Sequence, residues 1–264
     1  MGTSTGRRFD PAQIPTVALV TYVVSLVAWV ALVERWLPMP GGGAGGAMPM
    51  TAPGAPETMA LSNGLRGVGL YLLLWGVMMV AMMYPSSVSL FGLYYRTIAG
   101  ATRTGKAARV GAFMGTYAVV WAATGVVPLA VNAVVPIAAI AHSQGGRFLG
   151  GAFLLLSGYQ LSPYKDRCLT YCRTPLGFLM EYHEPGVLGA VRMSGRFSVF
   201  CVGCCWSLMA LMVVVGSMNL LWMAAIAVVL SLERVVPWGD RLATGVGVVA
   251  GVAGVGVLML SVVG

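Results

Sequence analysis

Apolar residues occur in long runs along most of this chain, and polar residues are confined to the segments between them. An α-helix needs about 20 mainly apolar residues to cross a bilayer. The pattern predicts seven membrane-spanning helices, at residues 16–33, 67–91, 110–131, 148–162, 197–216, 220–236 and 243–263. The fourth is the shortest, and together with the apolar run at 137–140 it also fits a partly re-entrant segment.

Composition supports the same class. Hydrophobic residues make up 58% of the chain and charged residues only 9%, with a mean hydropathy of +0.84, whereas a soluble protein carries about a quarter charged residues. We therefore expect an all-α, polytopic, multi-pass bundle of the cell inner membrane (plasma membrane). Residues 1–66 would form an anchor helix and an extracytoplasmic loop, and residues 67–264 a six-helix membrane domain. The first run ends in Glu34 and Arg35 rather than at a small-residue cleavage site, which favours an anchor over a signal peptide.

The distribution of Lys and Arg predicts the orientation. With the N-terminus inside, 13 of the 16 basic residues lie on the inner side of the seven predicted spans. Cytoplasmic loops retain Lys and Arg, so we expect a cytoplasmic N-terminus and an outer C-terminus. The net charge of +8 is then explained by basic residues that face anionic lipid. No basic stretch is interleaved with aromatic residues, and nucleic acid is therefore excluded as a partner.

Two glycine-rich segments have different expected roles. The outer loop at 38–59 is rich in Gly, Pro and Met and is expected to be flexible. Its methionines either are incidental in a spacer or offer thioethers to copper, and they are Met39, Met48, Met50 and Met59. In the last span, Gly247 and Gly251 have the spacing that lets membrane helices approach closely. Their expected role is packing, within the bundle or between protomers.

All five cysteines lie within 38 residues, as Cys168, Cys172, Cys201, Cys204 and Cys205. The last three stand in the first turns of the fifth predicted span, and both groups would lie near the inner boundary. Disulfides are disfavoured in the reducing cytoplasm, so the cluster predicts metal binding or redox chemistry. Buried cysteine also packs as a small hydrophobe. Five clustered cysteines with none elsewhere favour a metal site.

Methionines extend this sulfur pattern. Spacings of four, four and three residues place one row of sulfurs on a single helix face, formed by Cys201, Cys205, Met209 and Met212. The second predicted span carries two pairs one turn apart, Met78 with Met82 and Met79 with Met83. That spacing resembles the second span of Ctr-type copper transporters. Core packing and metal contact are both open for these methionines. Pro85 should kink this helix and free backbone carbonyls.

Other chemistry is sparse in the spans. Glu233 and Arg234 form the one candidate ion pair near the bilayer, and an interfacial position at the inner edge is expected for them. His142 and His183 fall on predicted loops. No chain of Asp and Glu crosses the membrane, which disfavours a proton pump. No phosphate-binding loop, zincin helix or nucleophile elbow is present in the sequence.

Two cysteine segments, at 159–178 and 201–209, resemble the bacterial domain-of-unknown-function 2182 family of predicted metal-binding integral membrane proteins. The segments at 75–85, 216–222 and 232–233 fit the same family. The resemblance implies a metal-binding membrane protein over residues 67–264. It also leads us to expect histidine at two positions where this chain has Tyr171 and Phe197. A site without these histidines is richer in sulfur, which favours copper(I) over zinc or iron.

These observations predict a protein without enzymatic activity that binds a soft metal ion, Cu(I) or alternatively zinc, and moves or delivers it at the membrane. The expected ligands are the five cysteines, and the expected transit sites are Met78, Met79, Met82, Met83, Met209 and Met212. A non-catalytic subunit or assembly factor of a larger membrane complex, such as a cuproenzyme, is the alternative, with another membrane protein as its partner. A thiol–disulfide enzyme that uses Cys201 and Cys204 ranks last, because their helix position lacks the setting of a soluble C-x-x-C site.

Overall fold

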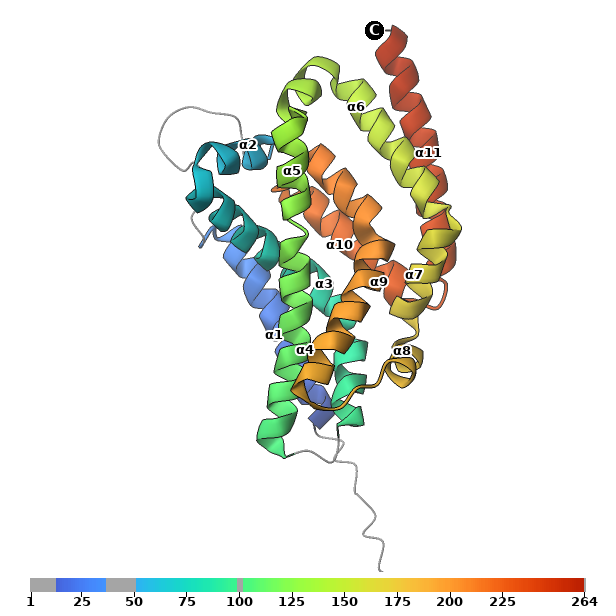
Figure 1. The fold of residues 1–264 in the computed structure, drawn as a ribbon. Coiled ribbons are helices and arrows are strands. Elements are labelled where there is room, and N and C mark those ends of the chain that lie inside the picture. Colours follow the sequence, from blue (N-terminus) through green and yellow to red (C-terminus); the bar gives the residue numbers. More distant parts are fainter. Residues whose placement is uncertain (1–12, 37–50, 99–101, 264) are drawn as a thin grey trace, which may run out of the picture.

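The computed structural model describes residues 13–36, 51–98 and 102–263, and in this part of the chain the regular structure consists of helices joined by short turns, without a strand (Figure 1). The predicted all-α class is confirmed. The helices are α1 (Gln13–Val33), α2 (Ala55–Ser62), α3 (Gly64–Thr97), α4 (Arg103–Ala123), α5 (Val126–Val134), α6 (Ile137–Gln160), α7 (Pro163–Arg173), α8 (Pro175–Glu181), α9 (Gly186–Val215), α10 (Leu220–Val235) and α11 (Gly239–Val263).

Five helical stretches among the described residues are long and apolar enough to cross a membrane: Thr16–Val33, Gly64–Thr97, Arg103–Val134, Gly186–Val215 and Gly239–Val262. The third of them joins α4 and α5. The two remaining predicted spans lie in α6 and α10, which are not among the five. α10 has only 16 residues, and α6 contains a non-helical residue at Gln144. The count of seven spans, the cytoplasmic N-terminus and the division at residue 66 stay predictions.

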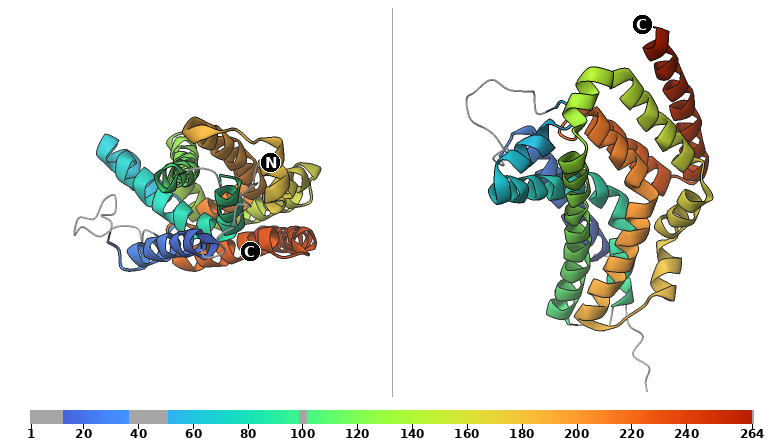
Figure 2. Two further views of the ribbon diagram at one scale, coloured as in Figure 1. Left: turned by 90° about the horizontal axis from the view of Figure 1, so that it is seen from below. Right: turned by 45° about the horizontal axis from the view of Figure 1, so that its top comes forward.

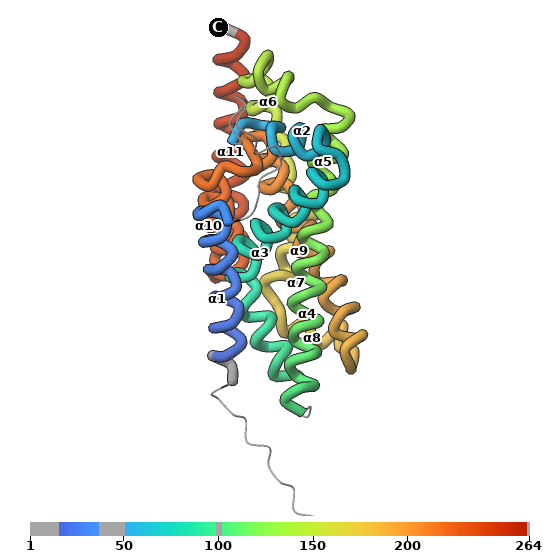
Figure 3. Tube along the Cα trace, turned by 90° about the vertical axis from the view of Figure 1, so that its left-hand side faces the viewer, coloured from blue at the N-terminus to red at the C-terminus, as the bar shows by residue number. Residues whose placement is uncertain are grey.

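Helix α3 is the centre of the bundle. It packs against α1, α4 and α10, and it buries aromatic and methionine side chains along most of its length. From below, α1 and α11 lie on one side of the molecule and α4 and α9 on the other (Figure 2). α4 packs against both α3 and α9. In Figure 3, α4 and α5 follow one another along one edge, opposite α1 and α11.

Pro85 fixes how α1 docks on α3. Proline has no N–H, so the carbonyl four residues earlier, that of Ala81, loses its helical partner. Two donors from α1 replace it: Ser25 Oγ at 2.8 Å and Trp29 Nε1 at 3.1 Å. The predicted freeing of a carbonyl is thus confirmed, and the freed group binds the neighbouring helix.

The glycines of the last helix pack within the bundle. α11 lies along α6 (Figure 1), where a Cβ at Gly251 would stand 2.8 Å from Ser157 Oγ. A Cβ at Gly254 would stand 3.0 Å from the Gly150 carbonyl oxygen. Side chains at these positions would therefore hold the two helices apart. The predicted packing role is confirmed, and it is intramolecular.

Two segments expected as loops contain helices. The predicted outer loop at 38–59 includes the start of α2 from Ala55 onward, with Met59 inside that helix, while Met39, Met48 and Met50 lie outside the described residues. The predicted inner segment at 163–196 holds α7, α8 and the first turns of α9. α9 therefore starts at Gly186 rather than at 197, so the placement of its cysteines in the first turns was wrong. Arg192 and Arg196 lower the local hydropathy and hide this continuation of the helix.

Candidate metal centre

Three thiols from two helices meet in the interior, where α7 packs against α9. The Sγ atoms of Cys172, Cys201 and Cys204 all lie within 4.8 Å of one another. Cys172 Sγ stands 3.5 Å from Cys204 Sγ, and all three residues are buried. The predicted convergence of the two cysteine segments is confirmed by this geometry. We call these three residues the thiol trio.

Local sequence determines where α7 begins and which face it turns to α9. The Ser162 side chain caps the helix by accepting from the Lys165 amide at 3.4 Å, and Pro163 occupies the first turn, where its missing N–H costs nothing. Cys168 and Cys172 are four residues apart and so share one helix face. That face meets Gly203, where a Cβ would lie 2.8 Å from Cys168 Sγ.

The two remaining cysteines lie at the edge of the trio. Cys205 is buried, with its Sγ 3.2 Å from that of Cys204. Cys168 is half-buried and packs over Gly203. The Tyr159 hydroxyl donates to the Gly203 carbonyl at 2.5 Å, which ties α6 to this part of α9. The structure thus brings three of the five predicted ligands to one point and keeps the other two beside it.

The surroundings of the two α7 thiols raise their pKa. Hydrogen bonds with the Cys201 and Cys204 thiols, assisted by burial, raise the pKa of Cys172 well above its ordinary value. Burial raises the pKa of Cys168 as well. Because thiolate is the form that binds metal, an incoming ion must displace the Cys172 proton.

A buried arginine, which the sequence pattern placed at the membrane interface, reaches toward the trio. Arg234 of α10 is only 6% exposed and donates to Ser86 Oγ at 2.7 Å and to Ser87 Oγ at 3.3 Å. Ser87 Oγ donates to the Tyr117 hydroxyl at 3.1 Å, and that hydroxyl lies 3.1 Å from Cys201 Sγ. Among the described residues, Arg234 makes no ion pair with a carboxylate. Its positive charge therefore faces the thiols through two hydroxyl groups.

The expected pair between Glu233 and Arg234 does not form. Glu233 Oε2 instead accepts from Lys165 Nζ at 2.6 Å, and its Oε1 accepts from Gln160 Nε2 at 2.8 Å. Adjacent residues on a helix point about 100° apart, so Glu233 faces α6 and α7 while Arg234 faces α3. Lys165 and Glu233 are 0% and 1% exposed. This buried pair holds α7, and with it Cys172, against α10.

The six methionines expected as transit sites lie on α3 and α9. All four of the α3 methionines are buried, as is Met212 of α9. Met209 lines an apolar cleft of about 420 Å³ with Trp75 and Trp121. α3 and α9 pack mainly through α4 rather than directly on each other. Tyr117 stands in this layer, in ring contact with Phe91 and Phe197. The predicted role of the methionines as transit sites stays a prediction.

Comparison with known protein families decides the class of the chain. The family described as PpoB2, copper chaperone, matches residues 72–257, which is more than half of the sequence. The chain belongs to this copper chaperone family. The matched region includes all five cysteines and the methionines of α3. No curated protein and no solved structure matches the chain.

The family match agrees with the resemblance seen in the sequence at the level of a copper-related membrane family. The matching family is described as a copper chaperone, and the match does not show membership of the domain-of-unknown-function 2182 family. The signals that sequence reasoning missed at this site are Arg234, Tyr117 and Ser87. In the sequence these residues are visible only as a cation and hydroxyl groups inside apolar runs. The positions of the helices are needed to show that they lie next to the thiols.

Proposed function

We propose that this protein binds Cu(I) through Cys172, Cys201 and Cys204 and hands the ion to another protein in or at the membrane, without catalysing a reaction. The observation that supports this most is that three buried sulfurs all lie within 4.8 Å of one another. A metal–sulfur bond of about 2.3 Å allows two sulfurs on one ion to be at most about 4.6 Å apart. The trio therefore needs only a small adjustment to share one ion.

The donor set favours copper over harder ions. Among the described residues, the group that could hold a metal ion consists of three cysteines and includes no histidine or carboxylate. Thiolates select Cu(I), whereas carboxylate and water suit magnesium or calcium. The copper chaperone description of the family supports the same choice. Zinc, the alternative, usually takes a fourth ligand in a structural site.

Charge also fits a monovalent ion. Cu(I) with three thiolates carries a net charge of −2, and Arg234 supplies a positive charge through Ser87 and Tyr117. The Lys165–Glu233 pair is neutral as a unit and leaves this balance unchanged. An anionic copper–thiolate complex would thus give Arg234 the counter-charge that it lacks.

Metal counting on serine variants tests the proposal. The full chain, purified and loaded anaerobically with Cu(I) under reducing conditions, should lose one copper per chain in each of Cys172→Ser, Cys201→Ser and Cys204→Ser. Cys168→Ser, from the same helix face but outside the trio, is the matched control and should keep that copper. Reducing conditions are needed because Cys172 and Cys204 are close enough to oxidise together. Unchanged copper in the trio variants, or stoichiometric zinc in place of copper, would overturn the proposal.

We also infer that the protein works in the inner membrane with its N-terminus in the cytoplasm. The five long apolar helices support a membrane location, and the predicted charge bias supports the orientation.

A further inference from the structure

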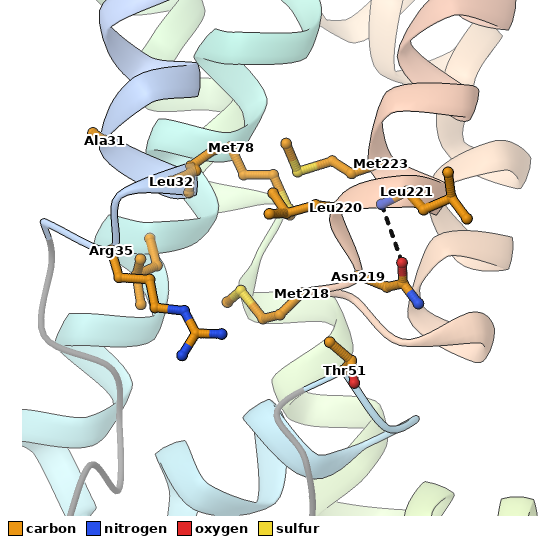
Figure 4. Close-up of a pocket in the computed structure, with 11 residues that line it drawn as sticks. Ala31, Leu32, Arg35, Thr51, Met78, Met218, Asn219, Leu220, Leu221 and Met223 are labelled. Carbon is orange, nitrogen blue, oxygen red and sulfur yellow. Dashed lines mark hydrogen bonds between the residues drawn. The ribbon is translucent and has the colours of Figure 1, made fainter.

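Three methionines meet at a cavity whose lining includes none of the cysteines. This cavity, of about 200 Å³, is lined by residues of α1, α3, the turn after α9, and α10. Met78 of α3 and Met223 of α10 extend toward one another, and Met218 reaches the same space from the turn (Figure 4). Met78 is 0% and Met223 1% exposed, while Met218 is half-buried. The thioether of Met218 is therefore partly accessible, and those of Met78 and Met223 are fully buried.

The turn that presents Met218 is firmly built. Gly216 follows the last residue of α9, and its φ of 105° suits glycine. Its missing Cβ leaves room for the Thr51 carbonyl oxygen, 2.0 Å from where that Cβ would stand. Ser217 Oγ donates to Glu57 Oε1 at 2.8 Å. Asn219 then caps α10 by accepting from the Leu221 amide at 3.1 Å. Met218 is therefore held in place on both sides.

One acidic and one basic side chain lie near the turn that presents Met218. Glu57 is 0% exposed, accepts at Oε1 from Tyr71 and Ser217, and leaves its Oε2 without a partner in the described structure. Arg35 also lines the cavity, but it is exposed, so water screens its charge. The buried acid is joined through Ser217 to the turn that presents Met218.

We propose that Met78, Met218 and Met223 form a second, thioether-only Cu(I) site that loads the thiol trio, an inference that rests on the proposed function. Thioethers bind Cu(I) without releasing a proton and carry no charge, so they hold the ion less firmly than thiolates. Along α3, Met78 lies nine residues from Ser87, which is about 13 Å. Ser87 stands at the level of Tyr117 and Cys201. Met79, Met82 and Met83 fill the intervening turns, all buried. The ion would therefore pass from a weaker site to a stronger one.

Ag(I) serves as a redox-inactive probe that shares the preference for sulfur. In a variant with Cys172→Ser, Cys201→Ser and Cys204→Ser, we expect the full chain to keep one Ag(I). Adding Met218→Leu should weaken that binding at least about tenfold, because one of three ligands is lost while side-chain volume is kept. Mass spectrometry after peroxide treatment gives an independent readout. Bound Ag(I) should protect Met218 from oxidation to the sulfoxide. Met180, which is 76% exposed and lies on α8, is the matched control and should oxidise equally with and without Ag(I).

The outcomes separate this proposal from the one on which it rests. If the serine variant binds no Ag(I) and Met218 oxidises at the same rate with the ion present, the methionine site is refuted while the thiol site stands. If Ag(I) binds and protects Met218 although the serine changes remove no copper, the thiol site is refuted and the methionine site stands. Circular dichroism of each variant confirms that the helices are intact.

Discussion

Arg234 is buried in an unusual setting for a cation. Moving a charge out of water into a protein interior costs several kcal/mol unless it is paired. Its partners in the described structure are two serine hydroxyls and the ring of Phe197, 5.9 Å from Cζ, and its Nε has none. Thiolates beyond Tyr117 would supply the missing negative charge. The arginine and the trio are therefore best understood as one electrostatic unit, in which each stabilises the charged form of the other.

This view predicts a charge-specific effect on metal affinity. Arg234→Gln should weaken Cu(I) binding by about tenfold, since a unit charge that acts on buried thiolates across two hydroxyl groups is worth on the order of 1–2 kcal/mol. Arg234→Lys keeps the charge and should recover most of the affinity. The measurement is a competition titration with a Cu(I) chelator under reducing conditions. Equal weakening by Lys and Gln would show that shape and hydrogen bonding, rather than charge, explain the role of Arg234.

A second residue-scale prediction concerns Gly203. Gly203→Ala would place a Cβ 2.8 Å from Cys168 Sγ and should turn that thiol away from α9. Because the thiol can rotate and alanine favours a helix by up to about 1 kcal/mol, stability should change little. We expect instead that Cys168 is alkylated several-fold faster. Mass spectrometry measures the rate of its alkylation. Gly195→Ala, also in α9 but with no atom near its Cβ position, is the control. An unchanged alkylation rate would show that Gly203 does not hold Cys168 in place.

At the scale of elements, Pro85 and Ser25 form a coupled pair. Ser25→Ala removes one of the two donors to the Ala81 carbonyl and should destabilise the protein by about 1 kcal/mol. Pro85→Ala restores an N–H four residues after Ala81, so the same serine change should cost less in that background. Thermal unfolding of the two single variants and the double variant gives the coupling energy. Strictly additive costs would mean that Pro85 and Ser25 do not act on the same carbonyl.

The apolar runs predict the centres of the long helices well and their ends poorly. Residues 67–91 were expected as one span, and α3 extends it to Gly64 and Thr97. α9 begins eleven residues before the predicted start, because Arg192 and Arg196 interrupt the apolar pattern while the backbone remains helical. These arginines pair with Glu184 at the start of α9. Hydropathy measures contact with lipid, whereas helix ends depend on capping and on such local pairs.

The whole molecule shows which part of the site a sequence can reveal. The clustered cysteines predicted that two segments converge, and Cys172 and Cys204 indeed lie together. The environment of the trio could not be predicted, because it comes from three helices brought together by packing. Tyr117 lies on α4, Ser87 on α3 and Arg234 on α10, and none stands near a cysteine in the sequence. Only the fold reveals that a cation and two hydroxyls face the thiols.

The path of the chain bears on the orientation of the entire bundle. α1 begins at the lower end of the molecule and α11 finishes at the upper end (Figures 1 and 3). Both five and seven crossings are odd, and each count places the termini on opposite sides of a membrane. Reporter fusions at residue 1 and at residue 264 should therefore report a cytoplasmic and an outer location, respectively. An outer reporter at residue 1 with a cytoplasmic reporter at residue 264 would contradict only the orientation predicted from the charge bias. The two termini would still lie on opposite sides of the membrane. Two cytoplasmic reporters would contradict the odd number of crossings. They would indicate that only one of α6 and α10 crosses the membrane, since α10 has only 16 residues and α6 is broken at Gln144.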